Sequence, residues 1–167
     1  MKRLALLASL LTWSSLLTGL GCCSNQPHIV RVTGDQVVPP VETKGYGHAN
    51  FLPEQCGTYM RYSINVQDLS LEEVTGATIH LGQPCDTGPC VATLFPHAPL
   101  PSPPSSGRLI YACLCRQDLQ GPLAGKTLGA LVKEIDAGNA YLVIQTRQHP
   151  DGELRGQISS HIKPNRF

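Results

Sequence analysis

Apolar and polar side chains alternate along several short segments of the chain. The clearest segment covers residues 58–66, and its apolar alternate positions are Met60, Tyr62, Ile64 and Val66. Successive side chains of a β-strand point to opposite faces of the sheet. The pattern therefore predicts a strand with one buried face and one solvent-exposed face.

A second alternating segment ends at Leu81 and is followed by the turn residues Gly-Gln-Pro. Its inward positions are Ala77, Ile79 and Leu81, and its outward positions are Thr78 and His80. Residues two apart on a strand share a face. The segment therefore predicts a strand that places Thr78 and His80 side by side on the outward face.

Further short segments predict a sheet of several strands. The candidate strands are residues 28–32, 91–95, 109–115, 140–146 and 153–159. The segment 109–115 is apolar throughout and predicts a buried strand, whereas the proline-rich segment 96–107 predicts a loop. The sequence His-Pro-Asp-Gly at 149–152 predicts a turn. Several short strands joined by turns favour a mainly β fold, either a sandwich or a barrel.

One stretch has the spacing of a helix instead. Leu128, Leu131, Val132 and Ile135 recur at i, i+3, i+4 and i+7, which is one face of an amphipathic helix. Gly138 stands where such a helix would end. We therefore expect one short helix in a fold that is otherwise β.

The first residues have the pattern of an export signal. Lys2 and Arg3 precede an apolar stretch from Leu4 to Leu20, which serines and threonines interrupt. A membrane-spanning helix, which needs about 20 mostly apolar residues, is the alternative. The serines and the absence of charge after the stretch favour a signal peptide over residues 1–21.

Cys22 follows this signal, in the position of the acylated cysteine of bacterial lipoproteins. Secretion without a lipid is the alternative. A lipid on Cys22 would tether the protein to a membrane surface without spanning the membrane. The remaining chain is expected to divide into a linker at 22–28, one domain at 29–162 and a tail at 163–167.

The charge pattern argues against a nucleic-acid partner. The 13 lysines and arginines nearly balance the 12 aspartates and glutamates, and the formal net charge is +1. Nucleic-acid-binding surfaces need clustered positive charge, and the sequence has no basic run. It also has no G-x-S-x-G, H-E-x-x-H or phosphate-binding glycine loop, which favours a non-enzymatic protein.

The cysteines of an exported chain are expected to form disulfides. Seven are present, so six remain if Cys22 carries a lipid. The disulfide candidates are Cys56, Cys85, Cys90, Cys113 and Cys115. The alternative is a metal site formed by the last four of these. Their C-x4-C and C-x-C spacings differ from the C-x2-C common in zinc sites.

Several stretches together, in order, resemble one known family. "GDQVVPPVETKGYGHANF", "VTGATIHLGQP" with "GPCVATL", and "LVKEIDAGNAYLVIQT" with "HPDGELRGQI" resemble the chordin-type, or CHRD, domain. The resemblance covers residues 29–158. It implies a single Greek-key, immunoglobulin-like antiparallel β-sandwich, similar to copper–zinc superoxide dismutases. The family occurs in secreted bacterial proteins and in chordin, an extracellular antagonist of growth factors.

The family motifs also select candidate site residues, namely His80, Gly82, Gly152, Glu153, Arg155 and Gly156. The central motif of the family usually reads His-Ile-His, a geometry suited to a transition metal. Here Thr78 takes the first histidine position and Gln145 takes that of a later one. His80 alone remains as a candidate metal ligand, and a hydrogen-bonded strand histidine is the alternative interpretation.

The ending motif contains a second candidate. Glu153 and Arg155 are two apart and are expected to share a strand face. The planar guanidinium of Arg155 suits anion recognition. The alternative is a structural arginine that binds backbone carbonyls or pairs with a carboxylate.

These observations together predict a non-enzymatic exported CHRD-domain protein, anchored at the cell envelope as a binding or structural module. The expected partner is another protein or an envelope component, and the loop at 101–106 is one candidate contact surface. No cofactor is expected. The alternative is a metal-binding or redox protein that resembles the dismutase-like sandwiches and uses a transition metal at His80.

Overall fold

The structure is a computed structural model that describes residues 26–54, 58–95 and 108–159. The predicted signal at 1–21, the lipidation candidate Cys22, the disulfide candidate Cys56 and the proline-rich loop lie outside the described residues. Within them, no helix is long and apolar enough to cross a membrane.

The described chain forms a sheet of eight antiparallel strands and one α-helix. The strands are β1 (His28–Thr33), β2 (Tyr46–Glu54), β3 (Tyr59–Gln67), β4 (Val74–Leu81), β5 (Cys90–Phe95), β6 (Arg108–Cys115), β7 (Ala140–Thr146) and β8 (Leu154–Gln157). The helix α1 (Leu128–Asp136) follows β6, and a short 3-10 helix, η1 (Gly34–Gln36), follows β1.

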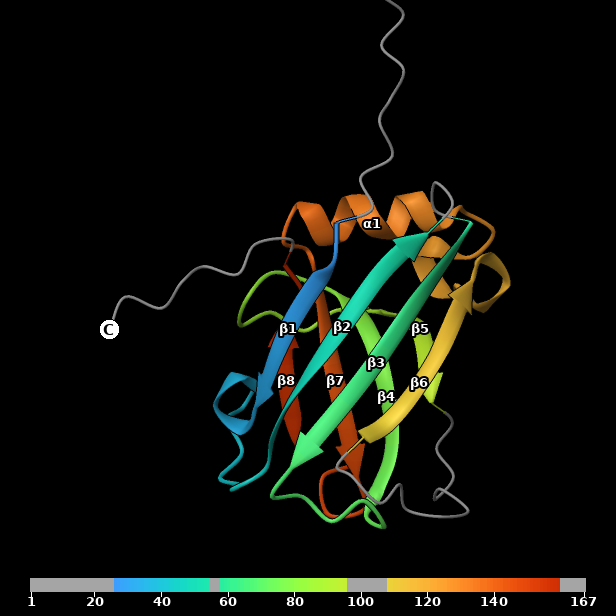
Figure 1. The fold of residues 1–167 in the computed structure, drawn as a ribbon. Helices are drawn as coiled ribbons and strands as arrows, with labels where there is room; N and C mark the ends of the chain where they lie inside the picture. Colours follow the sequence, from blue (N-terminus) through green and yellow to red (C-terminus); the bar gives the residue numbers. More distant parts are fainter. Residues whose placement is uncertain (1–25, 55–57, 96–107, 160–167) are drawn as a thin grey trace, which may run out of the picture.

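The sheet folds over into two layers. Its strand order is β5-β4-β7-β8-β1-β2-β3-β6. Strands β1, β2, β3 and β6 form one layer, here called the front layer, and β8, β7, β4 and β5 form the back layer (Figure 1). Pairing of β3 with β6 and of β4 with β7 joins strands distant in sequence, as in a Greek key. The predicted antiparallel sandwich is confirmed.

The hydrophobic core lies between the layers, and α1 covers one end of it (Figure 1). The largest fully buried side chains are Phe51, Met60, Ile64, Ile79, Leu114, Leu123, Leu128, Leu131, Ile135, Leu142, Ile144 and Leu154. They include two of the four inward positions predicted for β3, Met60 and Ile64, and three apolar positions predicted for the helix. Gly138 ends the helical region with φ +73°, a conformation that favours glycine.

Three details differ from the sequence expectation. The nine-residue strand β2 was not recognised, because the small inward residues Gly47 and Ala49 give no apolar alternation. The strand predicted as buried at 109–115 is β6, which lies at an edge of the sheet and exposes 60% of Tyr111. Thr78, predicted to face outward, does so, but it is only 4% exposed.

Burial shifts two pKa values in opposite directions. Desolvation lowers the pKa of His28, and the carboxylate of Asp136, 3.9 Å from Nδ1 of His28, opposes this shift in part. Desolvation raises the pKa of Tyr62 to about 12. The Tyr62 hydroxyl donates a hydrogen bond of 2.6 Å to the carbonyl oxygen of Leu94, which connects β3 in the front layer to β5 in the back layer.

Candidate functional site

A chain of hydrogen bonds joins three outward side chains of the back layer. Thr78 and His80 lie on β4, and Gln145 lies on the neighbouring strand β7. Nε2 of Gln145 donates to Oγ1 of Thr78 over 2.7 Å. Oγ1 of Thr78 lies 3.0 Å from Nε2 of His80, and Nδ1 of His80 lies 2.9 Å from the carbonyl oxygen of Gly88. The structure thus brings together His80 and the two residues, Thr78 and Gln145, that occupy the other histidine positions of the family.

The partners of this chain define the proton positions on His80. A carbonyl oxygen can only accept, so Nδ1 of His80 carries the proton that Gly88 accepts. Nε2 can then accept the hydroxyl proton of Thr78, whose oxygen in turn accepts from Gln145. Both ring nitrogens of His80 therefore have hydrogen-bond partners while the imidazole is neutral.

These residues do not fit a copper or zinc site. A metal would have to displace the hydrogen bond at one of the two ring nitrogens of His80. In the described part of the chain, no group of three or more histidine, cysteine, aspartate or glutamate side chains could hold a metal ion. The geometry supports the hydrogen-bonded strand histidine, and titration with copper or zinc would test the alternative that His80 binds a metal.

The loop between β4 and β5 is held against this face. The hydroxyl of Tyr141 accepts a 2.9 Å hydrogen bond from the backbone N–H of Gly88, whose carbonyl binds His80. A Cβ at Gly88 would lie 1.6 Å from the carbonyl oxygen of Leu81, so only glycine fits there. The rings of His80 and Tyr141 stack with their centroids 5.3 Å apart.

Arg155 completes the stack. Its guanidinium carbon lies 3.8 Å from the centroid of the Tyr141 ring, and Nη2 donates a 3.2 Å hydrogen bond to the carbonyl oxygen of Gln83. The residue is only 4% exposed. A guanidinium over an aromatic face gains a cation–π attraction of about 0.5–2 kcal/mol. The structure shows Arg155 bound to a backbone carbonyl, as the structural interpretation expects.

Glu153 makes its own contacts and forms no ion pair with Arg155 in the described structure. Its two carboxylate oxygens each accept a 2.7 Å hydrogen bond, from the hydroxyls of Thr43 and Thr146. The Thr146 oxygen also accepts from the backbone N–H of His149. The carboxylate thus joins the loop before β2 to the end of β7.

The motif glycines allow close backbone packing. A Cβ at Gly156 would lie 2.1 Å from the carbonyl oxygen of Arg31, so glycine lets β8 lie against β1 where the two layers join. Gly152 has φ +132°, and a Cβ there would meet a methyl of Val143 at 2.6 Å. A Cβ at Gly82 would contact the Tyr141 ring at 3.1 Å. These positions serve the fold.

The predicted disulfides are not found among the described cysteines. Cys85, Cys90, Cys113 and Cys115 all carry free thiols. Cys85 is exposed, whereas Sγ of Cys90 lies 3.6 Å from the carbonyl oxygen of Ala92 and accepts from Gln120. Cys113 and Cys115 alternate along β6 and share one face.

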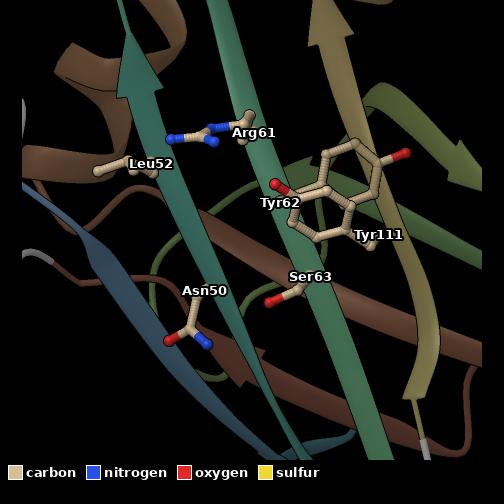
Figure 2. Close-up of a pocket in the computed structure, with 6 residues that line it drawn as sticks. All are labelled: Asn50, Leu52, Arg61, Tyr62, Ser63 and Tyr111. Atoms are coloured by element: carbon tan, nitrogen blue, oxygen red, sulfur yellow. The ribbon is translucent and has the colours of Figure 1, made fainter.

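A shallow cavity of about 250 Å³ lies on the outer face of the front layer, and sequence reasoning missed it. It is lined by Asn50, Leu52, Arg61, Tyr62, Ser63 and Tyr111, from β2, β3 and β6 (Figure 2). Arg61 forms an ion pair with Glu54, and this carboxylate raises the pKa of Arg61. Cross-strand pairing of Ser63 with Tyr111 creates the site, and alternation within one strand cannot reveal such a pairing.

Comparison with known proteins supports one family. The family model described as "CHRD domain" matches residues 29–158. The zebrafish (Danio rerio) protein chordin is 29% identical over 130 residues, which are 77% of this chain and 12% of that protein. The chain thus corresponds to a small part of that relative. No solved structure gives a significant match.

Proposed function

Because this chain belongs to the CHRD domain family, we propose that it is a non-enzymatic binding module, exported and held at the cell envelope by a lipid on Cys22. The partner is another protein, and it binds the cavity on the outer face of the front layer. The observation that carries this proposal is the exposed side chain of Tyr111 beside Arg61 on the edge of that layer.

The chemistry of this cavity suits a protein partner. Tyrosine and arginine are enriched among the residues that dominate protein–protein binding energy. Tyr111 keeps 60% of its surface exposed, and Leu52 adds apolar surface close by. Asn50 and Ser63 supply hydrogen-bonding groups next to these apolar surfaces. An apolar or aromatic side chain flanked by backbone amides would match this set of contacts.

Site-specific photocrosslinking in cells tests the binding surface. A photoreactive phenylalanine analogue replaces Tyr111 in the full-length chain, and a matched protein carries it at Tyr46. Tyr46 is also an exposed tyrosine, but it lies at the opposite end of β2 from Leu52 and Glu54. We expect a crosslinked protein of defined mass from position 111 and none from position 46. Equal crosslinking from both positions, or none from either, would refute the proposed surface.

The anchor is supported by the charged start, the apolar stretch and the cysteine that follows it. Full-length protein made in bacteria with radiolabelled palmitate should incorporate label into the membrane fraction. Cys22→Ala should abolish that label, and the adjacent Cys23→Ala should keep it. Label that persists in Cys22→Ala, or that is lost equally in both variants, would contradict the proposed anchor.

A further inference from the structure

We propose that Arg155 anchors a binding site for small monocarboxylates on the outer face of the back layer. Two adjoining cavities, of about 170 Å³ and 330 Å³, meet at this residue. Val37, Val38 and Arg155 line both of them. This site is on a different layer from the cavity at Tyr111, and it does not rest on the proposed function.

The charge of Arg155 is buried without a counter-ion. Its one hydrogen bond in the described structure uses one of five N–H donors. No ion pair forms between Arg155 and any carboxylate of the described residues, and Glu153 is already bound by two threonine hydroxyls. Buried charges in proteins are usually paired, because desolvation of an ion costs several kcal/mol. A carboxylate ligand would supply the missing partner.

The guanidinium is held in place before any ligand binds. It lies over the ring of Tyr141, and it donates to the carbonyl of Gln83. Tyr141 is itself fixed, because its hydroxyl accepts from Gly88 and its ring stacks on His80. A planar donor fork that is already oriented binds a carboxylate through two parallel hydrogen bonds with little loss of side-chain freedom.

The cavity walls select the class of carboxylate. Val37, Val38, Pro40 and Pro84 give the larger cavity an apolar lining that suits a compact hydrocarbon group. The exposed carboxylates Asp35 and Asp151 line the larger and the smaller cavity, respectively. Their negative charge disfavours ligands with two or more negative charges. The site therefore suits a singly charged carboxylate with a compact hydrocarbon group.

Isothermal titration calorimetry of the full-length chain with 3-methylbutanoate tests this inference. We expect saturable binding with a Kd below about 10 mM, which is a weak but measurable affinity for one ion pair and a small apolar group. The alcohol 3-methylbutan-1-ol, inorganic phosphate and succinate serve as controls and should bind at least about tenfold more weakly. No saturable binding of 3-methylbutanoate, or equal or tighter binding of any control, would overturn the inference.

Variants locate the binding at Arg155. Val38 is 40% exposed at the cavity wall, so Val38→Asp should fold and should weaken 3-methylbutanoate binding at least about fivefold by charge repulsion. Arg155→Lys, which keeps the charge but loses the fork, should also weaken binding. Tyr111→Asp adds the same charge to the front layer and should leave binding unchanged. Equal effects of Val38→Asp and Tyr111→Asp would overturn the assignment.

Discussion

Removing one hydroxyl from the hydrogen-bonded chain of the back layer should destabilise the fold measurably. Thr78→Val keeps the shape of the side chain and removes the oxygen that lies between Gln145 and His80. Gln145 is 6% exposed, and its Oε1 already has no hydrogen-bond partner in the described structure. After the substitution, the whole side-chain amide of Gln145 would be buried without a partner.

The size of the effect follows from these contacts. A buried polar group left without its partner costs about 1–3 kcal/mol. His80 is only half-buried, so water can replace the Thr78 hydroxyl at Nε2 and this loss adds little. The additional methyl of valine returns less than about 1 kcal/mol. We expect Thr78→Val to lower the free energy of unfolding by about 2 kcal/mol.

Urea unfolding followed by circular dichroism measures this change. Thr93→Val is the matched control, because Thr93 pairs with Thr78 across β4 and β5 but is exposed. The control should stay within about 0.5 kcal/mol of the parent protein. Adding Gln145→Leu to Thr78→Val should recover most of the lost stability, since no buried amide then lacks a partner. Equal stability of Thr78→Val and Thr93→Val would refute this reasoning.

Three further predictions concern the core and the junction of the layers. Burial lowers the pKa of His28 in the folded state below its unfolded value of 6.5. As the pH falls below 6.5, the unfolded state therefore binds more protons than the folded state, and the free energy of unfolding decreases. Urea titrations at pH 7.5 and 5.5 should show a smaller loss in His28→Leu, and equal losses would contradict burial of a neutral His28. Folding raises the pKa of Tyr62 from 10.0 to about 12. The protonated Tyr62 hydroxyl therefore contributes its full stabilisation below pH 10, and this contribution is lost as the pH rises through about 12. Absorbance at 295 nm should show one tyrosine that ionises last, and this step should disappear in Tyr62→Phe; an unchanged last step would refute the assignment. Gly156→Ala should lower the melting temperature by several degrees, because its Cβ meets the backbone of Arg31, whereas Gly129→Ala on α1 should not lower it; equal melting temperatures would contradict this packing.

Alternation within single segments was enough to predict much of the sandwich. Met60, Ile64 and Ile79 lie in the core as predicted, because one strand face must be buried. The same reasoning missed β2, where Gly47 and Ala49 occupy inward positions and are too small to mark a face. It also misplaced β6, because an apolar segment does not reveal whether its strand is central or at an edge.

The candidate site was only partly predictable. The family resemblance selected His80 and compared Thr78 and Gln145 with two histidine positions of the family, and the structure joins the three side chains through hydrogen bonds. The stack of His80, Tyr141 and Arg155 was not predictable, because its members come from three strands whose register the sequence does not reveal. A strand histidine with hydrogen-bond partners at both ring nitrogens indicates a structural role for His80.

The metal content of full-length protein, purified without added metal, tests this conclusion most directly. Elemental analysis of copper, zinc and iron against protein concentration separates a binding module from a metal-dependent or redox protein. We predict far less than one metal ion per chain, because both nitrogens of His80 are bound by Thr78 and Gly88. A content of about one copper, zinc or iron per chain, lost on His80→Ala, would contradict the account.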